Sequence, residues 1–318
     1  MLYIIIFIVV LNLAFILPRL LPGNFAQVSD LSFAQSQDFQ QYQNQVEARL
    51  GLNQSMSYQY IAFLKGMFLT WPPYLGVSFL YYPETVTNLV ATRLPWTMLL
   101  ILSSLAIALG IMFLVGGYTA TRRGSFVETL AQYISVAVHS TPIFWVAMIM
   151  VWVLGVDAKW FPVFGNVGVT VHGTANYLIS VVWHAVLPVA SLSLAIFGEH
   201  YLLLRGSIQE VLQSDYVLAA KGRGLKQRLI ATRYILRNSL LPLVSILSFS
   251  IAKIIGLVIL VEKVFGYPGL GDLIVDAISG RDYPVLQGSL FYFTLIVILG
   301  GLIGDFIMVR LNPNLRHQ

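Results

Sequence analysis

The chain has 318 residues, of which 57% are hydrophobic and only 10% are charged. Soluble domains carry about 25% charged residues, so no soluble fold could cover this apolar surface, and the lipid bilayer must be the solvent. The formal charge of +5 fits loops beside anionic lipid better than nucleic-acid binding, and the absence of cysteine excludes disulfides and thiolate metal or redox chemistry.

Several apolar segments are long enough to be membrane-spanning helices, which need about 20 residues. They are Leu2–Leu17, Trp96–Gly117, Val127–Leu154, Tyr177–Leu204, Leu240–Val261 and Val285–Val309. The first is short, and a signal peptide is its alternative, but it has no basic residue before it and no small-residue cleavage site after it. We therefore expect an all-α polytopic membrane protein with six transmembrane helices.

The basic residues predict the orientation of these helices. Seven of the nineteen lie between Arg205 and Arg237, in one loop between two apolar segments. Six spans put both termini on one side, and the positive-inside rule places this loop in the cytoplasm. The sequence thus predicts a multi-pass protein of the cytoplasmic membrane with both termini cytoplasmic.

The sequence divides into three segments. Residues 1-21 are expected to form the first transmembrane helix, and residues 22-95 an extracytoplasmic cap of short helices and turns. The cap begins with a polar stretch and then has apolar residues at helical spacing over Tyr58–Phe68, followed by proline and aromatic clusters. Residues 96-318 form a five-helix core that includes the basic loop 205-238.

Sequence signatures of catalysis are missing from the chain. It has no glycine-rich phosphate loop ending in Gly-Lys-Ser/Thr and no Gly-x-Ser-x-Gly motif, and its five histidines show no metal-ligand spacing. We expect neither an enzyme nor a bound metal or cofactor.

The basic loop has a distinctive small-residue pattern. Asp215 is expected to cap a short helix that Gly206 and Gly224 bracket, and Gly224 offers a positive-φ position to end it. One edge of this helix is apolar, with Val217, Ala220 and Leu225. Four of its residues have almost no side-chain bulk, so another protein can approach closely: Ala219, Ala220, Gly222 and Gly224. The alternative is a basic loop that only binds lipid headgroups.

This pattern resembles a known loop. The series Asp215-Tyr216-Val217-x-x-Ala220-x-x-x-Gly224-Leu225, followed by Arg237-Asn238-x-Leu240-x-Pro242, resembles the cytoplasmic coupling loop of binding-protein-dependent ABC importer permeases. It is most similar to the dipeptide/oligopeptide/nickel branch, although the acidic residue of the general importer pattern is replaced by Leu218. The resemblance implies that an ATPase contacts Asp215, Tyr216, Val217, Ala219, Ala220, Gly222, Gly224 and Leu225.

The resemblance covers nearly the whole chain. Further similar segments are Arg93–Thr97, Arg122–Ser125, Ser140–Trp145, His184–Pro188 and Glu262–Gly271. The last of these implies an external loop or gate that includes Glu262, Phe265, Pro268 and Gly269. The chain departs from the family at Asn24-Phe25, which follow Pro22-Gly23, and at Leu202, where an arginine is frequent.

The family implies a type I ABC importer permease fold with an external cap between helices 1 and 2. It also implies a second homologous permease, two cytoplasmic ATPase subunits that bind ATP and Mg, and an extracytoplasmic substrate-binding protein. The expected function is import of dipeptides or oligopeptides by alternating access. The same machinery importing oligosaccharides or a nickel chelate is the alternative. A secondary transporter or channel is a more remote one, and it predicts inverted repeats that the sequence lacks.

Lys253 lies within the fifth apolar segment, where the family generally has a small or hydroxyl residue. A charge at that depth is costly unless it is paired or hydrated. Two interpretations remain open, namely a cation that lines the pathway and meets substrate, and a salt bridge to a neighbouring helix. Asp305, near the end of the last segment, is expected to have a structural role.

Overall fold

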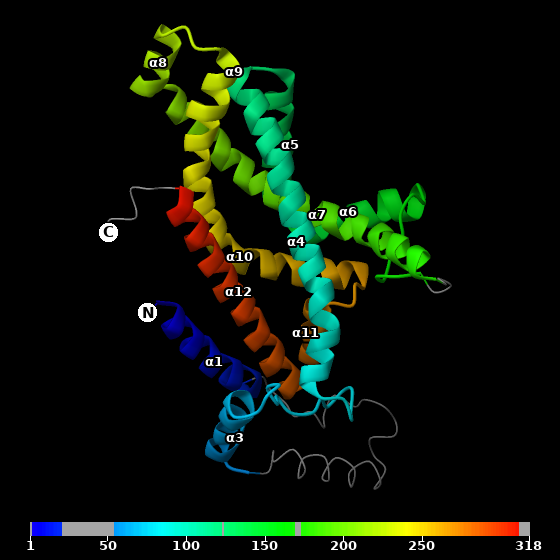
Figure 1. Cartoon of the computed structure of the whole chain (residues 1–318). Coiled ribbons are helices and arrows are strands. Elements are labelled where there is room, and N and C mark those ends of the chain that lie inside the picture. The colour runs from blue at the N-terminus through cyan, green and yellow to red at the C-terminus, as the bar shows by residue number, and fades with distance from the viewer. Residues whose placement is uncertain (1, 21–53, 123, 169–172, 312–318) are drawn as a thin grey trace. The chain divides into compact units, whose positions relative to one another are not determined.

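The computed structural model describes residues 2–20, 54–122, 124–168 and 173–311 (Figure 1). Across these ranges the regular elements are helices, and the one extended pairing is an isolated antiparallel bridge between Val77 and Thr85. The chain forms two compact units: Met1–Thr97 with Pro268–Ile298 is unit 1, and Met98–Tyr267 with Leu299–Gln318 is unit 2. The all-α prediction is confirmed.

Four described helices are long and apolar enough to cross a bilayer. They are α1 (Leu2–Leu20), α4 (Val86–Thr121), α7 (Thr174–Leu212) and α12 (Tyr283–Leu311). A bent pair adds a fifth if it counts as one span. The predicted segment Leu240–Val261 lies inside α10 (Arg237–Phe265), a helix of 29 residues, and the count of six spans stays a prediction.

The third predicted span, Val127–Leu154, is not one straight helix. It consists of α5 (Phe126–Ser140), α6 (Ile143–Met150) and the π-helical segment η2 (Val151–Asp157), with a bend of 109° after α5. The bend falls at Pro142, which has no N–H to donate, and Thr141 before it is extended, with φ −104° and ψ 129°. The apolar composition extends across the break, so composition alone did not predict it.

The helices of unit 2 pack around α7, which contacts α5, α6 and α10. Leu192, Ile196 and Leu204 on α7 are fully buried. A Cβ added to Gly198 of α7 would lie 3.2 Å from the Ser135 carbonyl oxygen on α5, so the glycine permits close approach of the two helices. The contact joins α5 and α7 firmly at their middle.

In unit 1, α1 packs against α3 (Met56–Phe68), the helix predicted over Tyr58–Phe68. The Tyr60 hydroxyl donates a hydrogen bond to Asn12 Oδ1 at 2.8 Å, and the rings of Tyr60 and Phe15 lie 5.1 Å apart, edge to face. Much of the predicted cap, residues 21–53, lies outside the described residues, so the cap stays a prediction.

Two of the family-like segments meet in unit 1. Helix α11 (Leu270–Ser279) starts after Gly269, which has no side chain to cap it. The buried Thr97 hydroxyl accepts a hydrogen bond from the Leu270 N–H at 2.7 Å and so satisfies one orphan donor of this helix. Arg93 lies one turn before Thr97 and its guanidinium is 3.7 Å from the Asp272 carboxylate in the first turn of α11.

The loop before α4 also packs against α11. The Tyr81 hydroxyl donates to Asp276 Oδ2 at 3.2 Å. Burial raises the pKa of Tyr81 and the Asp276 carboxylate raises it further, so this hydroxyl remains protonated at neutral pH. A Cβ on Gly280 would lie 2.5 Å from the Leu80 side chain, so a larger residue there would require the Leu80 side chain to move.

Asp282 connects the same loop to the start of α12. Its buried carboxylate accepts hydrogen bonds from the Ser78 hydroxyl and from the N–H groups of Phe79 and Leu80 through Oδ2. Its Oδ1 accepts from the Val285 N–H at 3.2 Å. One side chain therefore satisfies donors from two segments that are about 200 residues apart in the sequence.

We predict that Asp282→Ala destabilises unit 1 by at least about 3 kcal/mol, because it leaves several buried donors without an acceptor. Asp282→Asn should cost less, because its amide oxygen still accepts. Thermal unfolding of the purified transporter would measure both. Asp157→Ala, at an exposed aspartate, is the control and should change stability by less than about 0.5 kcal/mol. Equal effects of the Asp282→Ala and control substitutions would contradict this role.

Candidate functional site

The predicted short helix in the basic loop is present as α8 (Asp215–Gly222). Its N-cap is Ser214 and not Asp215, so the capping prediction was wrong by one residue. The Ser214 hydroxyl donates to the Val211 carbonyl at 2.5 Å, which closes the preceding turn. Asp215 lies in the first turn, where its negative charge interacts favourably with the positive end of the helix dipole.

The C-terminal end of α8 is a Schellman motif. Gly224 has φ +70°, as predicted, its N–H bonds the Lys221 carbonyl at 2.9 Å, and the Leu225 N–H bonds the Ala220 carbonyl at 3.4 Å. No atom lies within 4 Å of a Cβ added to Gly224, so its backbone angle and not crowding accounts for the glycine. These bonds fix the end of the helix.

Helix α8 has a buried apolar side and an exposed side. Val217 and Ala220 are 0% and 3% exposed, as the predicted apolar edge requires. Helix α8 contacts α7 and the π-helical segment η3 (Ile230–Leu236), and Leu225 lines a pocket of about 390 Å³ with Ile230 and Ile235. The short helix α9 (Gln227–Leu229) connects Leu225 to η3. Figure 1 shows α8 at the end of unit 2, beside α9.

The exposed side of α8 combines apolar, small and basic groups. Tyr216 and Leu218 are 43% and 55% exposed, although both have large apolar parts. Gly222 lies in the last turn of the helix, and no atom lies within 4 Å of a Cβ added to it. A helical glycine costs about 1 kcal/mol relative to alanine, and packing within this chain does not require it. This surface is therefore suited to close contact with another protein.

A second glycine of the loop does not have the predicted place. Gly206 was expected to bracket the short helix, but α7 continues through it to Leu212. Helix α7 has 39 residues and is roughly 58 Å long at 1.5 Å per residue. Only Gln213 and Ser214 separate it from α8, so a displacement of α8 acts directly on a helix long enough to cross the bilayer.

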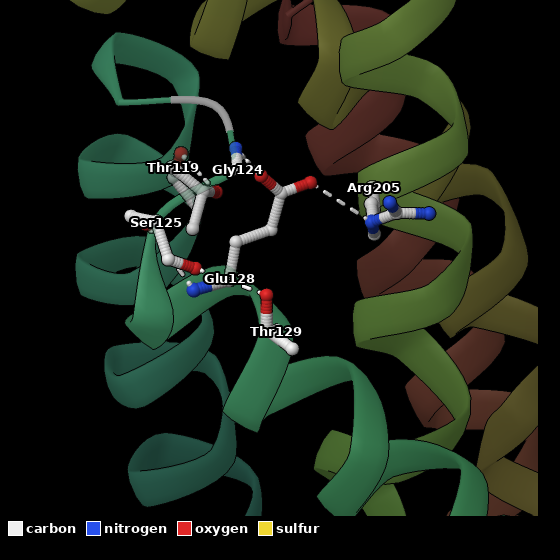
Figure 2. Close-up of polar contacts among 7 residues, drawn as sticks. Thr119, Gly124, Ser125, Glu128, Thr129 and Arg205 are labelled. Carbon is white, nitrogen blue, oxygen red and sulfur yellow. Dashed lines mark hydrogen bonds and ion pairs between the residues drawn. The ribbon is translucent and has the colours of Figure 1, made fainter.

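Glu128 joins the start of α5 to α7 (Figure 2). One carboxylate oxygen accepts from the Gly124 N–H at 2.8 Å, and the other lies 3.0 Å from Arg205 Nε on α7. The Ser125 hydroxyl caps α5 by accepting from the Glu128 N–H at 3.3 Å. The cluster lies two turns before the end of α7 and links α5 to the helix that leads into α8. Glu128 was not predicted as a site residue, although Ser-x-x-Glu is a capping signal.

The external-loop residues belong to the two units separately. In unit 2, Glu262 and Phe265 are buried, and α10 ends with Gly266 at φ +53° and a hydrogen bond from the Tyr267 N–H to the Glu262 carbonyl at 2.8 Å. In unit 1, Gly269 is buried before α11 and Pro268 is half-buried. These contacts shape the backbone, and the role of the residues as a gate stays a prediction.

Lys253 forms the salt bridge that was one of its two interpretations. Its Nζ lies 2.8 Å from Glu199 Oε2 on α7, and the two side chains are 53% and 25% exposed. Glu199 was not predicted as a site residue, because nothing in the sequence indicated which face of α7 it occupies. Within the described residues, no group of three or more His, Asp or Glu side chains is placed to hold a metal.

Comparison with known proteins identifies the family. Residues 112–317 match the model of the binding-protein-dependent transport system inner membrane component, and the chain belongs to this family. It is therefore a multi-pass membrane protein and a permease component of ABC transporters, not a catalytic enzyme. The family description indicates a transport system that uses a binding protein.

Similar proteins cover almost all of the chain. The oligopeptide transport system permease protein AppB of Bacillus subtilis is 30% identical over 96% of this chain and 93% of its own. The glutathione transport system permease protein GsiC of Pectobacterium atrosepticum is 29% identical, over 98% and 95%. The dipeptide transport system permease protein DppB of Escherichia coli is 28% identical, over 86% and 85%. The resemblance to the peptide branch is confirmed.

We predict that Gly224→Ala loosens the end of α8, because a left-handed φ costs a residue with a Cβ about 1 kcal/mol. Gly222→Ala is the matched control. Its position is helical and open, so alanine should stabilise the helix by a similar amount. Hydrogen–deuterium exchange of the 215–225 amides should therefore speed up in the first variant and slow down in the second. The same direction of change in both would be incompatible with the Schellman geometry.

We also predict energetic coupling between Glu128 and Arg205. Their side chains are 11% and 30% exposed, so water screens the pair only in part. A double-mutant cycle with Glu128→Gln, Arg205→Met and both together should give a coupling energy of about 1 kcal/mol in detergent unfolding. A coupling energy near zero would mean that the contact does not join α5 to α7.

Proposed function

We propose that the chain is the transmembrane permease subunit of an ATP-driven ABC importer that carries dipeptides or oligopeptides across the cytoplasmic membrane. The observation that carries the proposal is α8. This short helix ends in a Schellman motif, has small residues on its exposed side, and is separated from the long helix α7 by only two residues. The names of the relatives, for oligopeptide, glutathione and dipeptide transport, favour peptides over oligosaccharides or a nickel chelate.

In this proposal α8 is the docking surface for one of two cytoplasmic ATPase subunits, which bind ATP and Mg²⁺. A large side chain of the ATPase packs beside Gly222 and Ala219 and against the exposed rings and methyl groups of Tyr216 and Leu218. Lys221 and Arg223 are exposed around the contact and suit acidic groups of the ATPase or lipid phosphates. Both termini of the permease are then cytoplasmic.

The proposal also includes the other subunits of the importer. A second homologous permease completes the pathway, and an extracytoplasmic binding protein delivers substrate to the external loop that contains Glu262, Phe265, Pro268 and Gly269. The buried Glu262 and Phe265 keep this loop in shape. Lys253 lines the pathway on the exposed part of α10.

Alternating access requires that motion at α8 reaches the spanning helices. Helix α7 transmits it, since two residues separate the helices, and the Glu128–Arg205 pair transfers it to α5. The bend of 109° after α5 supplies a place where the helix direction changes. ATP binding shifts the population between outward- and inward-facing states only through contacts that differ between them.

Uptake by proteoliposomes tests the proposal. The vesicles contain this chain, its partner permease and the ATPases, with ATP inside and the binding protein outside. We expect ATP-dependent accumulation of labelled dipeptide or oligopeptide, and none without the binding protein. Accumulation of an oligosaccharide or a nickel chelate in its place would overturn the peptide assignment.

Gly222→Trp is predicted to uncouple the transporter. The indole adds bulk on the exposed side of α8 without backbone strain, so the helix should fold while the ATPase can no longer seat. Peptide uptake should fall at least about tenfold, while membrane insertion stays normal. Gly110→Trp, at an exposed and equally open helical glycine of α4, is the matched control. Normal uptake by Gly222→Trp would exclude α8 as the coupling contact.

A further inference from the structure

A pocket of about 310 Å³ lies in unit 2, where α5 ends and α6 begins. Its walls come from this bend and from α7 and α10. Its lining includes His139, Ser140, Thr141, Ala195, Glu199 and Lys253. The volume is at the lower end of the range for small-molecule sites, about 300–1,000 Å³. The pocket is therefore large enough for a ligand of two or three residues.

The Lys253–Glu199 ion pair lines this pocket. Lys253 is 16 residues from the start of α10 and 12 from its end. At 1.5 Å per residue these intervals are about 24 Å and 18 Å, so the pair lies deep in the helix. In a helix that spans the bilayer, as predicted for Leu240–Val261, a charge this far from both ends faces a water-filled cavity or another protein rather than lipid.

The pair is also poorly suited to a purely structural role. The Lys253 side chain is 53% exposed, and partly exposed ion pairs contribute little to stability because water screens them. The lysine amine has three donors and the carboxylate two oxygens, and one donor and one oxygen form the 2.8 Å contact. Among the described residues, neither group has a second ion pair. Both charges thus have hydrogen-bonding capacity left for a ligand.

We propose that Lys253 and Glu199 together bind the two charged ends of a short zwitterionic peptide during translocation. The peptide carboxylate binds the Lys253 amine and the peptide ammonium binds the Glu199 carboxylate. This inference rests on the proposed function and narrows its substrate class to peptides with free termini.

The distances fit a peptide of about two residues. The Lys253–Glu199 contact is 2.8 Å long, and two ligand contacts of similar length, one at each end, would extend the row to at most about 8 Å. An extended dipeptide spans roughly 7 Å. A longer peptide reaches both charges only if it bends, so the pair favours the shortest peptides.

The rest of the pocket suits the peptide backbone. Ser140 and Thr141 supply hydroxyl groups at the bend, and His139 adds a ring nitrogen. Ala195 and Leu257 make an apolar wall. We therefore expect the pocket to accept peptides with different side chains but to require both charged ends of the peptide. Oligosaccharides have no charges for this pair.

The test uses the permease–ATPase complex in nanodiscs without the binding protein, so that this site alone selects the ligand. Three probes are titrated by calorimetry: dialanine, dialanine amide, which lacks the carboxylate, and N-acetyl-dialanine, which lacks the ammonium. The wild-type complex should bind dialanine at least about tenfold more tightly than either derivative, because each loses one charge-assisted contact.

Each single variant should lose the preference for dialanine over one of its two derivatives. Lys253→Met should bind dialanine and its amide with equal affinity but still prefer dialanine over the acetylated form. Glu199→Gln should bind dialanine and the acetylated form with equal affinity but still prefer dialanine over the amide. Lys65→Met, at an exposed lysine of unit 1, is the control and should behave as wild type. The double variant Lys253→Met/Glu199→Gln leaves no unpaired charge, so it should fold and bind all three probes equally weakly.

A structural ion pair predicts a different pattern. If the pair were only structural, its removal would weaken binding of all three probes in parallel, or the wild-type complex would bind the three probes equally. Either result overturns the inference. The proposed function is judged separately by uptake through the full system. If the wild type imports peptides but the variants show no selective loss, only the zwitterion site is excluded. If the wild type imports no peptide, the proposed function itself is excluded.

Discussion

In hydrocarbon, a charged or hydrogen-bonding group without a partner costs several kcal/mol, because no water replaces the missing contact. Two ion pairs join long helices of unit 2 to one another. Arg205 of α7 pairs with Glu128 of α5, and Glu199 of α7 pairs with Lys253 of α10. Helix α7 therefore carries one partner of each pair, and it packs against both α5 and α10.

This central place of α7 explains how a contact at α8 can act at a distance. Its apolar side is buried against α5, α6 and α10, and this packing restrains it from bending. The two-residue connection leaves little slack between α8, the proposed docking surface, and α7. At Pro142, in contrast, the helix is interrupted, and its direction changes by 109° between α5 and α6.

Different physical reasons account for the glycines of the α8 segment. At Gly224 the backbone has a left-handed φ, so the requirement comes from this chain alone. At Gly222 neither the backbone angle nor a neighbouring atom requires glycine. Folding of this chain therefore requires the glycine at Gly224 but not at Gly222, and this contrast supports the proposal that another protein docks beside Gly222.

The sequence by itself determined the membrane class, the apolar segments, a short helix in the basic loop with its end at Gly224, and the family. Each depends on composition or on neighbours along the chain, where local physics decides. Only the tertiary structure decided that the third segment breaks after Thr141, that Gly206 lies inside α7, and that Lys253 meets Glu199. Partners that are 54 residues apart depend on which helix faces pack together, and a single sequence does not contain that information in local form.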